Sequence, residues 1–302
     1  MTHTATRTGR IRKKRLTAAM FLAPALLVYL IYIVYPVWGT LEYSFYDWKG
    51  GPDKIFVGLR NYAGLLSDPI FWNALQNNGK VLLVSVFIQI PLGLAMALLL
   101  LSRLKGRRLM QTVFFLPYLM PTVAVGLLFS YIFDPLNGPV NRILQLFGME
   151  TVAWLSDPRT ALPAVLLVVV WQHVPFYMVL LKAAIVGIPD ELYEAAAIDG
   201  AGALNRFRSI TLPLILPTVT ISSILAIVGS LKAFDLFYIM SGGGLNQEMD
   251  LMGSYMYRNA FVTFRMGYGS AVAFVMFVLC FTAAAIVQYM EHRRRKREGD
   301  ER

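Results

Sequence analysis

The 302-residue sequence has few charged residues. Asp, Glu, Lys and Arg make up 15% of it, against about 25% in soluble domains. Hydrophobic residues make up 57%. The length would allow about two soluble domains. A chain this poor in charge and this rich in apolar residues is instead expected to bury its apolar surface in lipid.

The sequence also lacks the motifs of an enzyme that works alone. Cys280 is the only cysteine, which excludes an intrachain disulfide and a cysteine metal cluster. His3, His173 and His292 have neither triad spacing nor metal-ligand spacing. The sequence contains no G-x-x-x-x-G-K-[ST] phosphate loop. We therefore expect no catalysis, metal or cofactor in this chain, and any ATP hydrolysis that it uses must come from a partner.

The net charge of +10 is concentrated near the two ends of the chain. Basic runs lie at 7–15 and 293–297. Such runs can bind nucleic acid, but beside long apolar segments they indicate cytoplasmic flanks that fix topology and meet anionic membrane lipid. We expect no nucleic-acid partner, and basic cytoplasmic tails at 1–15 and 291–302.

The first apolar stretch follows its basic run as it would in a signal peptide. It covers 16–38, which is too long for the apolar region of a signal peptide, and no small-residue cleavage site follows it. The stretch therefore predicts a retained transmembrane helix, followed by an outer loop over 39–76.

Six stretches are apolar and long enough to cross a membrane, which takes about 20 residues. Their backbone groups find no water in lipid, so they must be helices or strands of a closed barrel. The run 165–170 shows no period-two alternation, which argues against barrel strands. We predict an all-α polytopic membrane protein with six transmembrane helices, near 17–38, 81–101, 113–133, 162–181, 214–234 and 271–290.

Charge in the loops indicates the orientation. The loop 102–112 is basic without an acidic residue, whereas the loops 39–79, 134–161 and 235–270 each carry more acid than base. Both termini are therefore expected in the cytoplasm. The loop 182–213 is not net basic, and only the parity of the spans places it on the cytoplasmic side.

The loop between the fourth and fifth spans has a helical pattern throughout. Pro189 begins a short helix with acidic residues in its first turn, and Gly200 provides a C-terminal stop. A second short helix is predicted over 203–210, and Pro213 marks the entry to the next span. A helix–glycine–helix elbow would project from the membrane. The alternative is a passive link, but such a link needs only a few residues.

The elbow contains the triplet Glu194-Ala195-Ala196, followed by Gly200, Ile210 and Leu212-Pro213. The triplet alone is common, but together with these residues at fixed offsets it resembles the EAA loop of the permease subunits of binding-protein-dependent ABC importers. The resemblance implies the type I ABC importer permease fold, with a permease core over 77–290 and a coupling loop over 187–213 that docks in a cleft of an ATPase subunit. The matching residues are Glu194, Ala195, Ala196, Gly200, Ile210, Leu212 and Pro213.

Other segments resemble sugar-importer permeases, specifically the first permease of maltose and glycerol-3-phosphate importers. One departure is 242–245, which reads Gly-Gly-Gly-Leu where many relatives have Gly-Gly-Pro, so the local loop geometry stays open. The similar segments are 56–62 (FVGLRNY), 71–77 (FWNALQN), Leu116-Pro117 with Pro121, and 267–271 (GYGSA).

The resemblance also implies partners, a location and a substrate. The partners are a second homologous permease, an ATPase subunit dimer that holds ATP and Mg, and an extracytoplasmic solute-binding protein, and the location is a bacterial inner membrane. The substrate is a carbohydrate, with glycerol-3-phosphate or another small polar solute as the alternative. A secondary transporter is the alternative class, but the sequence shows neither an inverted repeat nor a mid-span acid.

Polar residues within the predicted spans are candidates for a substrate path, because such residues are costly in lipid. In the fourth span Gln172 and His173 lie beside Phe176, and aromatic faces with hydrogen-bonding groups suit a sugar. A polar contact between helices is the alternative. Gln89 in the second span is expected to make such a helix contact.

The fifth span adds Ser230, Lys232 and Asp235 near its outer end. Lys232 and Asp235 have i,i+3 spacing and could form an ion pair, or Lys232 could extend to the lipid interface. The resemblance places the sugar-site positions of the maltose relative at Phe176, Ala226, Ser230 and Ala233.

Overall fold

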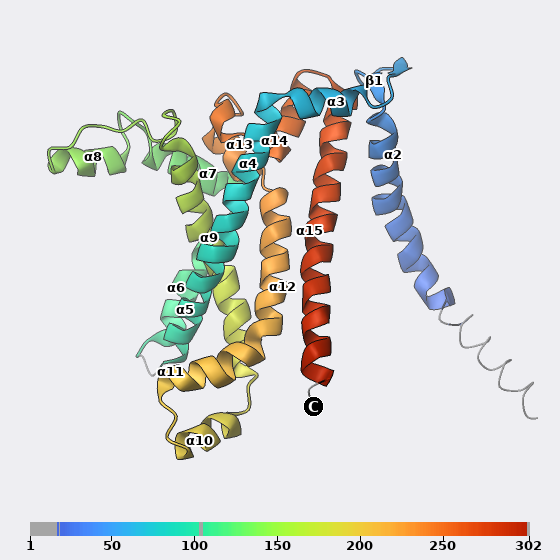
Figure 1. The fold of residues 1–302 in the computed structure, drawn as a ribbon. Coiled ribbons are helices and arrows are strands. Elements are labelled where there is room, and N and C mark those ends of the chain that lie inside the picture. The colour runs from blue at the N-terminus through green and yellow to red at the C-terminus, as the bar shows by residue number, and fades with distance from the viewer. Residues whose placement is uncertain (1–16, 18, 103–104, 301–302) are drawn as a thin grey trace, which may run out of the picture. The chain divides into compact units, whose positions relative to one another are not determined.

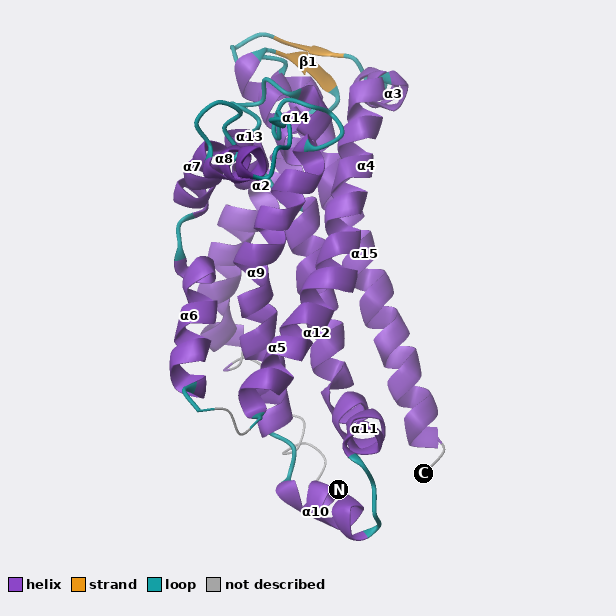
Figure 2. Cartoon of the chain, turned by 90° about the vertical axis from the view of Figure 1, so that its left-hand side faces the viewer, coloured by secondary structure: helices purple, strands orange, loops and turns teal. Residues whose placement is uncertain are grey.

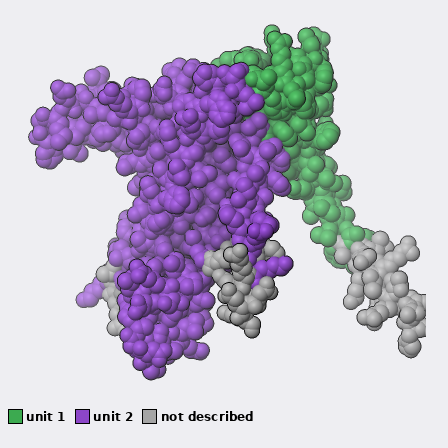
Figure 3. Space-filling model, in the orientation of Figure 1, with its two compact units in different colours: residues 1–64, 259–274 green, residues 65–258, 275–302 purple. Residues whose placement is uncertain are grey.

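The computed structural model describes residues 17, 19–102 and 105–300. The predicted tail at 1–15, the first residue of the predicted helix at 16–38, and Arg103 lie outside the described residues. The chain forms two compact units, residues 1–64 with 259–274 and residues 65–258 with 275–302 (Figure 3).

The smaller unit contains the first membrane-spanning helix and a β-hairpin. The helix runs Ala19–Tyr43 and ends in α2 (Tyr35–Tyr43). Strands β1 (Tyr46–Trp48) and β2 (Lys54–Phe56) pair antiparallel. Gly267 packs against this hairpin so closely that a Cβ there would collide with the Tyr46 carbonyl group. The motif at 267–271 therefore contains a glycine that permits backbone contact.

The larger unit is a bundle of long helices. Short helices α7, α8, α13 and α14 gather at one end, and an elbow over 187–213 that holds α10 and α11 projects from the other end (Figure 1, Figure 2). Helix α3 (Arg60–Ser67) leads into this unit, and α15 (Met266–Asp300) closes the chain. The remaining elements are α4 (Pro69–Val84), α5 (Ile90–Leu101), α6 (Arg107–Leu119), α7 (Thr122–Ile132), α8 (Pro139–Leu146), α9 (Ala161–Val186), α10 (Asp190–Ile198), α11 (Ala203–Arg206), α12 (Leu212–Leu231), α13 (Asp235–Met240), a 3-10 turn (Gln247–Met249) and α14 (Met252–Tyr257).

Five helices in the described part of the chain are long and apolar enough to cross a membrane, and one bent pair brings the number to six. The fold is therefore all-α and polytopic. The predicted tail from 291 continues α15 as far as Asp300. The five helices are Ala19–Tyr43, Pro69–Leu101, Ala161–Val186, Ala203–Leu231 and Met266–Met290.

The predicted span at 113–133 is not one straight helix, because the chain bends by 94° between α6 and α7. Pro121 lacks an N–H group and holds Met120 in an extended conformation, which ends α6. Beyond the break, α7 packs on α13, and its Gly126 lies where a Cβ would be 2.9 Å from the Ile239 side chain. The break therefore directs α7 toward α13.

Three other prolines, Pro36, Pro91 and Pro213, are each accommodated by a short π-helical turn instead of a helix end. The turns Leu30–Val34, Ser85–Gln89 and Phe207–Thr211 each precede a proline by two residues. In each, the residue before the proline donates its N–H to the carbonyl five residues back, which widens the helix near the proline ring. The predicted separate helix at 203–210 is therefore wrong: α11 and α12 form one continuous helix, and Pro213 lies within it.

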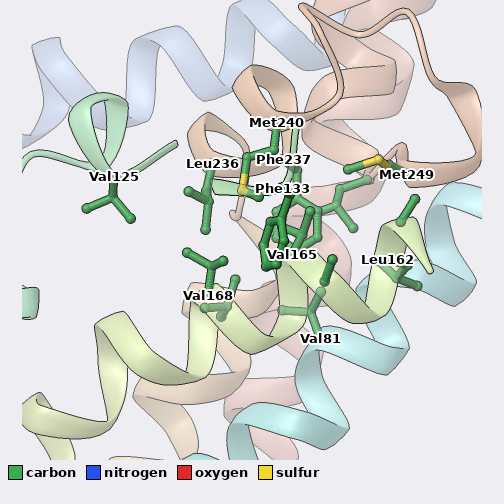
Figure 4. Close-up of a cluster of buried hydrophobic side chains, with 14 residues drawn as sticks. Val81, Val125, Phe133, Leu162, Val165, Val168, Leu236, Phe237, Met240 and Met249 are labelled. Atoms are coloured by element: carbon green, nitrogen blue, oxygen red, sulfur yellow. The ribbon is translucent and has the colours of Figure 1, made fainter. Parts of the chain in front are cut away.

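Two hydrophobic clusters hold the larger unit together. One lies at the α13 end and packs α9 against α7 and α13 through Val165, Val168 and Phe237 (Figure 4). The other lies toward the elbow and includes Met178 and Ile215. Because α9 contributes to both clusters, it is the central helix of the unit.

Gly93 on α5 offers a test of this packing. A Cβ there would lie 2.7 Å from the Tyr177 Cβ and 2.9 Å from the Met178 backbone nitrogen. Gly93→Ala should therefore lower the unfolding free energy by about 1–3 kcal/mol. Gly79 on α4 has no neighbour within 4 Å of its Cβ position. Gly79→Ala should be neutral or gain up to about 1 kcal/mol. Thermal unfolding in detergent measures both, and equal losses would contradict the close α5–α9 contact.

Candidate functional site

A cavity of about 190 Å³ lies between the α4–α5 junction, α9, α12 and the segment that starts α13. Its lining combines aromatic and aliphatic side chains with groups that can form hydrogen bonds. Four of the six residues suggested for a substrate path line it. The polar lining residues used below are Ser85, Gln89, His173, Ser230, Lys232 and Asp235.

Ser230 is the most firmly placed of these groups. It is buried, and its Oγ lies 2.7 Å from the Ala226 carbonyl oxygen and 3.1 Å from Ser85 Oγ. Its own carbonyl accepts a 2.7 Å hydrogen bond from Asn78 Nδ2. Ser230 is therefore fixed from both α4 and α12, which gives the cavity wall a defined shape.

His173 and Gln89 share one backbone carbonyl. His173 Nδ1 lies 3.0 Å from the Val169 oxygen, and Gln89 Nε2 donates to the same oxygen at 3.3 Å. The predicted helix contact of Gln89 is confirmed, and Gln89 also lines the cavity, which the sequence did not indicate. The second ring nitrogen of His173 has no partner among the described residues, so it is available to a ligand.

Lys232 and Asp235 line the cavity but do not form the ion pair that their spacing suggested. That spacing brings side chains together only on a continuous helix. Here α12 ends at Leu231, and Phe234 has φ −148° and ψ −63° before α13 begins. Both charged groups are exposed and are free to meet a ligand.

Gln172 and Phe176 face α6 instead of the cavity. Gln172 is buried and donates from Nε2 to the Met120 carbonyl at 3.4 Å, beside the α6–α7 break. Phe176 stacks on Tyr118 with ring centroids 5.3 Å apart. These positions fit the alternative of a contact between helices. Gln172 Oε1 has no hydrogen-bond partner among the residues that the structure describes.

Four polar residues, Asn77, Asn78, Asp250 and Arg258, form a belt at the end of the cavity that lies opposite the elbow. Asn78 donates to the Ser230 carbonyl and accepts from the Met252 N–H at 2.8 Å. Asn77 donates to the Asp250 carbonyl at 3.0 Å. Asp250 is 1% exposed and forms an ion pair with Arg258 at 2.5 Å. The groups that Asn77 and Asn78 bond lie more than 150 positions away in the sequence, so the pattern of residues gave no signal for this belt.

The Asp250 carboxyl group shows the electrostatic cost of this arrangement. Burial raises its pKa, while the Arg258 guanidinium and a hydrogen bond from Ser254 act in the opposite direction. The ion pair therefore offsets part of the desolvation of a buried charge.

Helix α10 ends in a turn at Gly200, as the sequence predicts. Gly200 has φ +77°, its N–H bonds the Ala197 carbonyl at 3.1 Å, and the Ala201 N–H bonds the Ala196 carbonyl at 2.8 Å. This is the Schellman motif, in which a left-handed glycine ends a helix. Apart from Gly200 itself and its two chain neighbours, no described residue has an atom within 4 Å of a Cβ built at Gly200. Its conformation alone therefore requires glycine there.

The elbow is attached to the bundle by a few side chains. Tyr193 OH lies 2.9 Å from Thr211 Oγ1, which joins α10 to the base of α12. Ile188 is buried in the cluster near the elbow, and Ile210 packs against that cluster. Ile210 therefore anchors the elbow.

The outward face of α10 has no partner within the described chain. Glu194 and Ala195 are exposed. Three apolar side chains that the sequence did not single out are exposed as well. These are Leu192, Ile198, which is 87% exposed, and Leu204. Exposed apolar side chains on a projecting elbow are typical of a protein docking surface.

An apolar helical bundle with a polar cavity and a projecting elbow defines a multi-pass membrane permease. Residues 89–296 match the family of binding-protein-dependent transport system inner membrane components. The chain belongs to this family.

Curated relatives cover nearly the whole chain. It is 37% identical to the trehalose/maltose transport system permease protein MalF of Thermococcus litoralis, over 89% of this chain and 91% of the relative. It is 35% identical to the probable ABC transporter permease protein YurN of Bacillus subtilis, over 89% of this chain and 94% of the relative. A solved bacterial ABC transporter for import of the acidic polysaccharide alginate contains a chain with the same fold, with TM-score 0.82, 24% identity and coverage of 95% and 99%.

Arg258→Met tests the polar belt. The substitution leaves the Asp250 carboxylate buried without its partner, which should cost about 3–5 kcal/mol of unfolding free energy. A raised carboxyl pKa means that stability is highest when the group is protonated and falls as pH rises through the folded-state pKa. The deficit of the variant should therefore grow from acidic to neutral pH. Thermal unfolding across that range measures it, and a deficit that is independent of pH would contradict the ion-pair role.

Proposed function

We propose that this chain is one of two permease subunits of an ATP-driven importer and that the elbow transmits the state of a separate ATPase to the cavity. The observation that carries this is the elbow itself. Its helix α10 is fixed at one end by the Gly200 turn and at its base by Tyr193, yet Glu194 and Ile198 are exposed and meet no other part of the described chain. A cleft in a soluble partner would bury that face.

The proposed role of the elbow also implies which partners the chain has. A dimer of ATPase subunits would hold ATP and Mg and receive α10, and a second homologous permease would complete the path. One solved neighbour is a bacterial alginate ABC transporter in complex with an alginate pentasaccharide-bound periplasmic protein. A similar solute-binding protein would deliver the substrate here.

The proposed location is a bacterial inner membrane with both termini in the cytoplasm. The loop-charge pattern supports this orientation. It puts the elbow in the cytoplasm, where ATP is available, and puts the loops around α8 and α14 on the outer side. The N-terminal basic residues that support it lie outside the described residues.

The proposed substrate is a carbohydrate. Relatives named for trehalose/maltose, lactose and diacetylchitobiose transport support this class. The cavity offers a serine hydroxyl, an imidazole nitrogen and a carboxylate, which suit sugar hydroxyl groups, beside Tyr177 and Phe237. Lys232 leaves glycerol-3-phosphate or another anionic solute as the second candidate.

Glu194→Lys should abolish transport and substrate-stimulated ATP hydrolysis while the chain stays inserted. Glu194 is proposed to pair with a basic group in the ATPase cleft, and loss of one member of a buried pair costs about 3–5 kcal/mol. Asp199→Lys makes the same charge change at the C-cap of α10 and should be milder.

Gly200→Val should also uncouple the importer, whereas Gly202→Val, at φ −69°, should not. Reconstituted uptake and ATPase assays decide, and wild-type values for Glu194→Lys would remove the coupling role.

Ser230→Ala should lower uptake without affecting assembly with the ATPase. Ser222→Ala is its matched control, because both serines are buried on α12 and lie within hydrogen-bond distance of the carbonyl four residues back, but only Ser230 lines the cavity. His173→Ala and Asp235→Asn should also weaken uptake, seen as a higher substrate concentration for half-maximal uptake. Equal uptake by the Ser230 and Ser222 variants would argue that the cavity lies off the path.

A further inference from the structure

The segment between α7 and α9 is a firmly built platform around α8. Asn141 on α8 is 2% exposed. Its Nδ2 lies within hydrogen-bond distance of the carbonyl oxygens of Asp134, Pro135 and Val152. Its Oδ1 accepts from the Val152 N–H and from Trp154 Nε1, both at 3.1 Å. These bonds fix the rotation of α8, so the face that it turns outward is defined.

The outward face of α8 is apolar. Val140 packs against the hydrophobic cluster that joins α9 to α13. Ile143, Leu146 and Phe147 follow at i, i+3 and i+4 spacing, which puts them on one side of the helix. Leu146 is 84% exposed and Phe147 is 76% exposed. Val140 thus contacts the protein, whereas most of the Leu146 and Phe147 side chains is exposed in the described chain.

The direction and position of α8 indicate what covers this face. Figures 1 and 2 agree that α8 lies across the direction of α9 and at about the height of α7, on the side opposite the elbow. Leu127 and Tyr131 of α7, the helix before α8, are exposed apolar residues as well. Exposed Arg142 lies three residues before Gln145, on the polar side of the helix. An amphipathic helix with a basic residue beside its apolar face, lying crosswise where the spans end, fits the membrane interface.

We propose that α8 is an interfacial helix whose Ile143, Leu146 and Phe147 side chains enter the lipid at the membrane surface opposite the elbow. Arg142 would meet the lipid phosphates from the polar side. This contact would hold the platform, and with it the start of α9, at a fixed depth. It is separate from the cavity and from the elbow.

The single cysteine of the chain makes a direct test possible. In a Cys280→Ser background, a nitroxide label is attached to Leu146→Cys, Phe147→Cys or, as the matched control on the polar side, Gln145→Cys. The complete importer is reconstituted in vesicles of phosphatidylethanolamine and phosphatidylglycerol, without solute-binding protein. Power-saturation EPR then compares collisions with oxygen, which concentrates in lipid, and with a water-soluble nickel chelate. Uptake by each variant, measured separately with the solute-binding protein added, confirms that it is folded and assembled.

The expected result is a higher oxygen-to-nickel collision ratio at 146 and 147 than at 145. Equal and high nickel accessibility at all three positions would place α8 in water and overturn the proposal. Low accessibility to both reagents at 146 and 147 would mean that protein, such as the second permease, covers the face, and would overturn it as well.

Discussion

Backbone hydrogen bonding in an apolar medium is the constraint on which the rest of this structure depends. A helix that crosses lipid has no water to satisfy a freed carbonyl or N–H group, so each proline within a span must be accommodated locally. At Pro36, Pro91 and Pro213 the chain does so with a π-helical turn and keeps the helix continuous. At Pro121 it breaks instead, and the freed Met120 carbonyl accepts from the Gln172 amide. A polar residue in the middle of α9 thus serves the backbone of its neighbour.

The same constraint explains why polar residues of neighbouring spans have different roles. Gln172 and His173 are adjacent in the sequence but lie on different sides of α9. Gln172 is used by the broken α6–α7 pair, and His173 turns toward the cavity. Ser230 and Lys232 lie where α12 ends, so the groups around them include loop carbonyls and charges that a continuous span would exclude. The cavity forms at the ends and junctions of helices, where polar groups are tolerated.

Local signals were therefore readable from the sequence, whereas signals that depend on packing were not. Apolar length located five spans, and glycine with its flanking pattern predicted the left-handed turn at 200. The break at Pro121 was not predicted, because nothing local distinguishes a proline that kinks a helix from one that ends it. The predicted pairing of Lys232 with Asp235 assumed that the helix continues through both residues, whereas it ends at Leu231. The bonds from Asn77 and Asn78 to residues 250 and 252 span more than 170 positions, and only the folded chain brings them together.

The continuity of α11 and α12 has a mechanical consequence for the proposed coupling. The helix Ala203–Leu231 has 29 residues, so it is about 43 Å long at 1.5 Å per residue. Tyr193 joins α10 to this helix through Thr211 near one end, and Ser230 lies in the cavity wall near the other. Two separate helices, as the sequence suggested, would absorb a displacement of α10 at the joint between them. A single helix passes it to Ser230, where Asn78 resists it from α4. A shift at the elbow is therefore expected to change the shape of the cavity wall, and the π-helical turn at Phe207–Thr211 is where the helix can yield first.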